Sequence, residues 1–262
     1  RKVLYDQYYG MEKEVVTGIV QRVMGKNVSV NLGKADGILS ENEQVKGEEF
    51  EPTERIKVYI LEVKDTPKGP RILLSRTHPG LVKRLFESEV AEVKDGTVEI
   101  KSIAREAGSR TKIAVWSNDP DVDPVGACVG MNGARVNSIV EELRGEKIDI
   151  INWDENPAIL IENALSPAKV IAVMADPDEK TALVVVPDYQ LSLAIGKEGQ
   201  NARLAARLTG FKIDIKSETQ ARESGELYDY DDEDEYYDEE EYSEEGAIES
   251  DKTETCLLYT SD

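Results

Sequence analysis

The chain has 262 residues, of which 40% are hydrophobic, and a formal net charge of −21 at pH 7. This length fits one to three compact units, and the lack of a long apolar run or a leader segment predicts a soluble protein of the cytoplasm without a membrane span. Cys128 and Cys256 lie far apart without CxxC spacing, which argues against a disulfide framework and a zinc site. Because the first residue is Arg1 rather than Met, we interpret the sequence as part of a longer protein.

The negative charge is concentrated near the carboxyl end. Residues 223–262 hold 18 acidic residues and one basic residue, whereas the other 222 residues hold 35 acidic and 31 basic ones. Phosphate binding depends on neutralisation by cations, so the total charge argues against a nucleic-acid partner. The distribution weakens that argument, because the amino-terminal part is nearly neutral and leaves room for a local basic surface.

Residues 14–77 are predicted to form a five-stranded OB-type β-barrel. Apolar and polar residues alternate in short runs, clearly so at Val28, Val30 and Leu32, and glycines separate the runs. The expected strands are residues 15–23, 28–32, 37–39, 55–63 and 72–75. Barrels of this type often carry a single strand of nucleic acid. The weaker candidates for RNA contacts are Arg22, Lys26, Lys34, Arg55 and Arg76, and the candidates for base stacking are Phe50 and Tyr59.

After residue 77 the pattern changes to mixed α/β and repeats once. Gly130-Met131-Asn132-Gly133 follows an apolar stretch, precedes a helical pattern and leads to Lys-Ile-Asp-Ile at residues 147–150. Gly196-Lys197-Glu198-Gly199 has the same surroundings and leads to Lys-Ile-Asp-Ile at residues 212–215. We therefore expect two copies of one α/β unit, at residues 78–152 and 153–218.

The paired glycines predict what these units bind. A GxxG loop brings the backbone close to a bound strand because glycine has no Cβ, and its amides can face phosphate oxygens. KH modules use such a loop to clamp about four nucleotides of single-stranded RNA. One GxxG is weak evidence, but two in matched surroundings favour tandem KH domains that bind one continuous strand. The candidate RNA-binding residues are Gly130, Met131, Asn132, Gly133, Arg135, Gly196, Lys197, Glu198, Gly199, Arg203 and Arg207.

Residues 219–262 are predicted to be a disordered acidic tail. Between residues 229 and 245, 12 of 17 residues are acidic and almost none is aliphatic. Such a segment cannot bury enough apolar surface to offset chain entropy. Residues 255–262 change abruptly to an apolar composition, which we interpret as a non-native end.

The sequence predicts no catalytic, metal or cofactor site. Asp119, Asp121 and Asp123 have the spacing of a calcium loop, but the glycine and glutamate that complete such a loop are missing. Gly196-Lys197 lacks the other residues of a Walker motif. His78 has no nucleophile or orienting partner near it in the sequence. We expect a chain without enzymatic activity.

Several longer blocks resemble the NusA family of bacterial transcription termination and antitermination factors. These blocks are residues 74–79, 99–106, 125–130, 145–150, 163–168 and 191–197. The resemblance covers about residues 1–218 in the order S1-type barrel, first KH domain, second KH domain, and it implies KH domains of type II. It also implies a monomeric, non-enzymatic factor that binds nascent RNA, RNA polymerase and other elongation or antitermination factors, and that modulates pausing and termination.

The chain departs from this family in two places. The polymerase-binding domain that opens the family's sequences corresponds here only to residues 1–13, a helix and linker, so polymerase contacts are expected mainly outside this chain. The first KH loop of the family usually has a basic residue where this chain has Asn132, which weakens the electrostatic part of that contact.

Two other interpretations stay open. An accessory RNA-holding region of a polynucleotide-phosphorylase-type exoribonuclease also joins KH and S1-type units, but with one KH followed by one barrel. Alternatively, the acidic tail imitates nucleic acid and occupies a basic partner. Deletion of residues 223–262 separates the last interpretation from RNA binding, because an RNA-binding factor keeps its activity without the tail.

Overall fold

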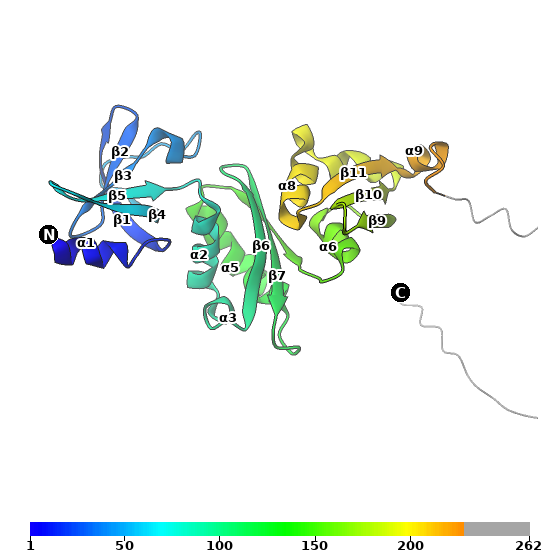
Figure 1. Ribbon diagram of the computed structural model, residues 1–262, viewed down its shortest axis with the longest axis horizontal. Coiled ribbons are helices and arrows are strands. Elements are labelled where there is room, and N and C mark those ends of the chain that lie inside the picture. The colour runs from blue at the N-terminus through cyan, green and yellow to red at the C-terminus, as the bar shows by residue number, and fades with distance from the viewer. Residues whose placement is uncertain (228–262) are drawn as a thin grey trace, which may run out of the picture. The chain divides into compact units, whose positions relative to one another are not determined.

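The computed structural model describes residues 1–227, a barrel followed by two mixed α/β units (Figure 1). The predicted disordered segment 229–245 and the apolar end 255–262 lie outside the described residues. Within residues 1–227, no helix is both long and apolar enough to cross a membrane.

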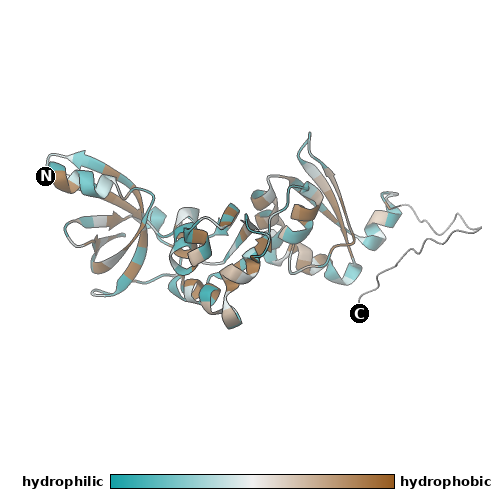
Figure 2. Cartoon of the chain, turned by 90° about the horizontal axis from the view of Figure 1, so that it is seen from below, coloured by the Kyte–Doolittle hydropathy of each residue, from teal (hydrophilic) through white to brown (hydrophobic). Residues whose placement is uncertain are grey.

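The first 77 residues form a closed five-stranded barrel preceded by a helix. The strands are β1 (Val15–Met24), β2 (Asn27–Asn31), β3 (Asp36–Leu39), β4 (Arg55–Thr66) and β5 (Gly69–Ser75), in the order β1-β2-β3-β5-β4. Helix α1 (Lys2–Tyr9) packs on the barrel, and the Tyr8 hydroxyl donates to the Leu32 carbonyl at 3.2 Å. A short 3₁₀ turn, η1 (Glu41–Glu43), follows β3. The alternation expected from the sequence buries Val28 and Val30 inside the barrel, and Figure 2 shows hydrophobic and hydrophilic residues alternating along these strands.

Apart from a second, short helix directly after the first, the first KH unit has the order helix, two strands, two helices, strand. Its elements are α2 (Pro79–Glu89), α3 (Ala91–Lys94), β6 (Val98–Glu106), β7 (Arg110–Ser117), α4 (Pro124–Val129), η2 (Met131–Gly133), α5 (Ala134–Glu142) and β8 (Lys147–Asn152). The sheet order is β6-β7-β8, with β6 and β7 antiparallel and β7 and β8 parallel. Ile139 of α5 and Leu143, directly after it, are buried in the hydrophobic cluster of this unit.

The second KH unit repeats that topology. Its elements are α6 (Pro157–Ala164), β9 (Ala172–Asp176), β10 (Thr181–Val186), η3 (Asp188–Gln190), α7 (Leu191–Ile195), η4 (Lys197–Gly199), α8 (Gln200–Thr209), β11 (Lys212–Ser217) and α9 (Glu218–Glu223). In the sheet β11-β10-β9, β10 pairs antiparallel with β9 and parallel with β11. The fold class predicted from the sequence, an OB-type barrel followed by two type II KH domains, is thus confirmed for the described residues.

The chain departs from the sequence prediction at residues 219–223, which we expected to begin the disordered tail. They form most of α9, which a capping box between Ser217 and Gln220 starts. Ala221 is fully buried, and Lys216 forms an ion pair with Glu226 at 2.7 Å. The motif Ser-x-x-Gln at residues 217–220 is a known start signal for a helix. The acidic composition that follows it led to the prediction of disorder instead.

The hydrophobic core of the second KH unit extends onto the first unit, which also has a core of its own. Ala104, Ala114 and Ile151, on the outer face of the first unit's sheet, pack in one cluster with α6 and α8 of the second unit. Polar contacts reinforce this junction: the Ser102 hydroxyl donates to the Leu208 carbonyl at 2.7 Å, and the buried ammonium of Lys112 donates to the Ser166 carbonyl at 2.7 Å. The apolar cluster and these bonds fix how one KH unit lies on the other.

Arg76 joins the barrel to the first KH unit. Its side chain is only 1% exposed, and its guanidinium donates to both carboxylate oxygens of Glu48 at 2.9 Å. It also contacts Glu142 of α5, with the carboxylate at 3.3 Å and the carbonyl at 3.1 Å. The prediction of Arg76 as an RNA contact is therefore wrong, because every side of its charge faces protein.

Candidate nucleic-acid interface

The two GxxG loops have almost the same backbone conformation. Gly130 and Gly196 have φ/ψ of 76°/175° and 79°/171°. The third residues, Asn132 and Glu198, adopt 53°/27° and 55°/26°. The last glycines adopt the left-handed region, at 74°/14° in the first loop and 75°/13° in the second. The duplication read from the sequence is thus a duplication of loop geometry.

The first glycine of each loop is required by its own fold. A Cβ on Gly130 would lie 3.0 Å from the backbone nitrogen of Arg135, and one on Gly196 would lie 2.8 Å from the backbone nitrogen of Asn201. By contrast, a Cβ on Gly199 would meet no atom closer than 3.9 Å. Glycine is therefore needed at positions 130 and 196 for the loop to fold, as well as for any close approach of a ligand.

The middle positions of both loops point into solvent. Met131 is 85% exposed, and Asn132, Lys197 and Glu198 are exposed as well. Each loop runs directly into a helix, α5 or α8, whose first amides have no partner within the helix. A phosphate at the loop would therefore meet backbone donors, with Lys197 as the one cation that the two loops contain.

The arginines predicted beside the loops are engaged with protein groups. Arg135 donates to Glu92 at 2.9 Å and to the Ala127 carbonyl at 2.7 Å. Its counterpart in the second unit is Asn201, which is buried and donates to the Ala194 carbonyl at 2.9 Å. In both units the side chain at this position donates a hydrogen bond to a carbonyl of the preceding helix, so it stabilises the fold of the loop.

Arg203 and Arg207 face the first KH unit. Arg203 forms an ion pair with Glu106, and the Arg207 guanidinium lies 4.0 Å from the same carboxylate. The Gln200 amide also donates to Glu106 at 2.8 Å. The hydrogen bond from Arg203 holds the pKa of Glu106 below its usual value against the effect of burial. Arg203 is thereby tied to the interface between the KH units, whereas Arg207 keeps a side chain that is 55% exposed.

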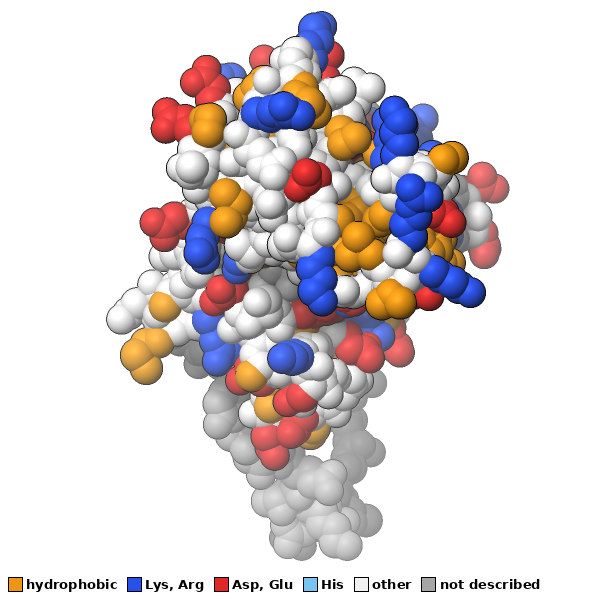
Figure 3. Space-filling view, turned by 90° about the vertical axis from the view of Figure 1, so that its left-hand side faces the viewer, with side chains coloured by type: hydrophobic (Ala, Val, Ile, Leu, Met, Phe, Trp, Pro, Cys, Tyr) orange, Lys and Arg blue, Asp and Glu red, His pale blue; other side chains and the backbone are white. Residues whose placement is uncertain are grey.

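The barrel candidates come from several different strands and turns. Arg22 and Lys26 lie toward the β1–β2 turn, Lys34 follows the other end of β2, and Arg55 opens β4 beside Ile19. Lys26 forms an exposed pair with Glu41 at 3.3 Å. Figure 3, seen from the barrel side, shows Lys and Arg side chains interspersed with Asp and Glu.

The aromatic residues proposed as stacking platforms are buried. Phe50 lies under the guanidinium of Arg144 at 4.9 Å, and Tyr59 stacks on His78 with ring centroids 4.5 Å apart. The prediction that they stack on bases is wrong, because neither ring has a free face. His78 also accepts a hydrogen bond from the Gly80 amide at 2.9 Å, which caps α2.

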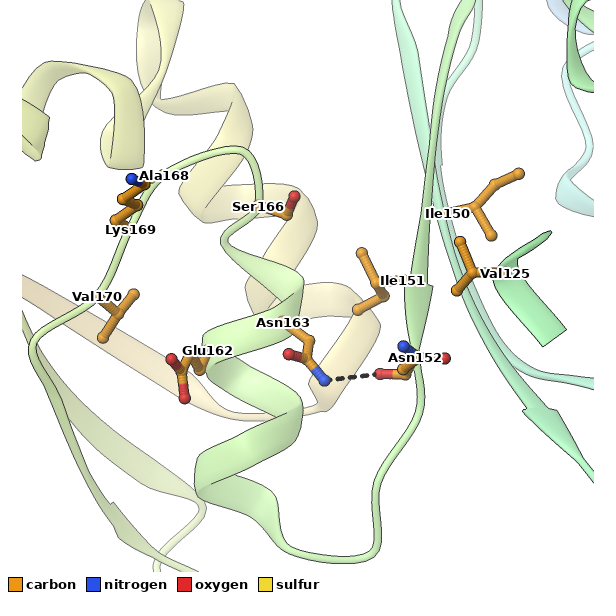
Figure 4. Close-up of a pocket in the computed structure, with 10 residues that line it drawn as sticks. All are labelled: Val125, Ile150, Ile151, Asn152, Glu162, Asn163, Ser166, Ala168, Lys169 and Val170. Carbon is orange, nitrogen blue, oxygen red and sulfur yellow. Dashed lines mark hydrogen bonds between the residues drawn. The ribbon is translucent and has the colours of Figure 1, made fainter. Parts of the chain in front are cut away.

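A groove that sequence reasoning missed lies where the two KH units meet (Figure 4). It has a volume of about 540 Å³, with Val125 of α4 and Ile150 of β8 among its apolar lining and Asn152, Asn163 and Lys169 among its polar lining. The Asn163 amide reaches from α6 and donates to the Asn152 carbonyl at 3.1 Å. No sequence signal marks this groove, because its two walls come from different KH units.

Comparison with known proteins agrees with this architecture. Residues 10–75 match the S1 RNA binding domain, residues 76–153 the NusA-like first KH domain and residues 157–223 the NusA-like second KH domain. The transcription termination/antitermination protein NusA of Bacillus subtilis is 61% identical over 225 residues, which are 86% of this chain. The chain belongs to the NusA family.

Other relatives extend this likeness across bacteria. The NusA proteins of Halalkalibacterium halodurans and Thermus thermophilus are 58% and 48% identical over 87% and 81% of the chain. The chain spans only 61%, 60% and 55% of the B. subtilis, H. halodurans and T. thermophilus proteins. The resemblance stated from the residues is confirmed, and the family models place the S1 domain before both KH domains.

Proposed function

We propose that this chain is a non-enzymatic transcription factor that binds nascent single-stranded RNA and RNA polymerase in the bacterial cytoplasm. As a monomer acting with other elongation or antitermination factors, it modulates pausing, termination and antitermination. The observation that carries the proposal is the GxxG loop built twice with the same backbone angles, on KH units joined by one hydrophobic cluster. Contact with polymerase is assigned mainly to sequence outside this chain.

One RNA strand is proposed to cross both KH units. In the first unit α4 lies against β8 beside the Gly130 loop, and in the second unit α7 lies against β11 in the same way. The groove at the junction is lined by Val125 and Ile150 on one side and by Lys169 on the other, and the strand is proposed to pass through it from the first unit to the second. Because the shared hydrophobic cluster holds the units together, a strand that binds both loops has little inter-domain entropy to lose.

The electrostatic part of the contact is expected to depend on Lys197. Replacing it with glutamine removes the one cation of the loops, so RNA affinity falls modestly and the slope of log affinity against log salt decreases by about 0.7, the value for one phosphate of a single strand. The matched control is Lys83→Gln on α2, another exposed lysine. Titrations at several salt concentrations measure the affinity and its salt dependence for each variant. An unchanged slope for Lys197→Gln would show that Lys197 does not contact a phosphate.

Deletion of the acidic tail distinguishes an RNA-binding factor from a protein whose tail imitates nucleic acid. Deleting residues 228–262 leaves α9 intact and removes most of the net negative charge of the chain. We expect the shortened chain to bind an unstructured oligoribonucleotide at least as tightly as the full chain, because like-charge repulsion decreases. Fluorescence anisotropy measures this, and loss of RNA binding on deletion would contradict the proposal.

The exoribonuclease alternative is disfavoured by module order. That class of accessory region joins one KH to one following barrel, whereas here the barrel precedes two KH units.

A further inference from the structure

Tyr189 is an exposed aromatic residue that packing does not explain. Its side chain is 77% exposed, and it belongs to the turn η3 between β10 and α7. The equivalent position of the first KH unit, sixty-six residues earlier, is Asp123. The fold therefore does not need an aromatic ring here, and a ring left in water is a candidate for contact with a ligand.

The turn that carries Tyr189 is held on both sides. The Asp188 carboxylate accepts hydrogen bonds from the backbone amide of Thr219, at 3.1 Å, and from its hydroxyl. The Gln190 side chain accepts a hydrogen bond from the backbone amide of Lys169 at 3.0 Å. The backbone of Tyr189 is thus fixed before any ligand binds, so contact with its ring costs little chain entropy.

The position of the turn relates Tyr189 to the RNA path. Lys169, bonded to the neighbouring Gln190, lines the groove between the KH units. Helix α7, which begins two residues after Tyr189, leaves Leu193 and Ile195 exposed at 45% and 38% and leads to the second GxxG loop. The turn therefore joins a residue of the junction groove, through the Gln190–Lys169 bond, to the helix that leads into the second GxxG loop.

We propose that the Tyr189 ring stacks on a base of the RNA strand where it passes from the first KH unit to the second, with the Lys169 ammonium on a neighbouring phosphate. This inference rests on the proposed function. Stacking on an aromatic ring is tolerant of base identity, so Tyr189 contributes affinity and fixes the register of the strand without selecting a sequence. It also supplies the aromatic contact that Phe50 and Tyr59, both buried, cannot make.

The test uses the full chain and a set of oligoribonucleotides that each carry 2-aminopurine at one position. We expect Tyr189→Ala to lower affinity by about 5-fold to about 150-fold and to relieve quenching of 2-aminopurine at one position only. Tyr189→Phe keeps both the affinity and the quenching, because the ring remains. Lys169→Gln is expected to lower the salt dependence of binding while the quenching persists.

The outcomes separate this inference from the proposed function. Equal affinity and equal quenching in Tyr189→Ala and the parent chain would overturn the stacking role. If, in the same experiment, replacing both Met131 and Lys197 with aspartate lowers the affinity, the GxxG loops still bind RNA and the proposed function stands. If neither variant changes affinity, both proposals fail. Unchanged RNA binding with loss of a protein partner in Tyr189→Ala would assign the ring to a protein surface and overturn the inference.

Discussion

Replacing Met131 and Lys197 with aspartate in one chain is expected to lower the affinity for an unstructured oligoribonucleotide by about 30-fold or more. Both side chains are exposed at the tips of the loops, so the substitutions add charge without removing packing. Two unit charges about 4 Å apart repel by about 1 to 4 kcal/mol in a partly hydrated site, and each new carboxylate faces a phosphate. Fluorescence anisotropy at fixed salt measures the change.

The matched control for this variant is Lys83→Asp on α2, which makes the same charge change as Lys197→Asp away from both loops. We expect it to alter affinity much less than the loop variant. Substitutions at Gly130 or Gly196 are poorer tests, because the added Cβ collides with the backbone of the following helix. Full affinity in the double aspartate variant, with an unchanged circular dichroism spectrum, would show that the loops do not hold the RNA.

Replacing Arg76 with methionine is expected to lower the free energy of unfolding by about 3 to 5 kcal/mol, the cost typical of breaking a buried ion pair from one side. The Glu48 side chain is only 6% exposed, and its carboxylate would be left without the two bonds it receives from Arg76. Urea denaturation followed by circular dichroism measures the loss. Because Glu142 belongs to the first KH unit, the variant also loosens the barrel from that unit.

Two further variants identify the cause of that loss. Adding Glu48→Gln to Arg76→Met removes the uncompensated charge and is expected to recover part of the stability. Lys64→Ala, which breaks an exposed pair with Glu62, is expected to cost no more than about 1 kcal/mol. An Arg76→Met chain as stable as the parent would contradict the buried network.

Sequence patterns were sufficient where the signal is local. The barrel strands follow from alternation, and Val28 and Val30 are buried as that alternation requires. The KH repeat follows from two glycine pairs in equal surroundings, because positive φ at Gly130 and Gly196 leaves little choice of residue. In both cases the residues that determine the structure are close together in the chain.

The errors arose where the deciding partner is distant in sequence. Arg76 looks like a surface cation until Glu48 and Glu142, 28 and 66 residues away, enclose it. Phe50 is covered by Arg144 from a different unit. Single-sequence patterns carry no information on such contacts, so they missed the burial of these residues.

The most direct test of the central claim is a crosslinking experiment on a complex of one chain with one RNA strand. The strand carries a photoreactive uridine near each end, and crosslinked peptides are identified by mass spectrometry. We expect crosslinks from the two ends of the same strand to map to peptides that contain residues 130–133 and 196–199, respectively. Crosslinks confined to one KH unit, or a complex with a separate strand on each unit, would contradict a continuous RNA path.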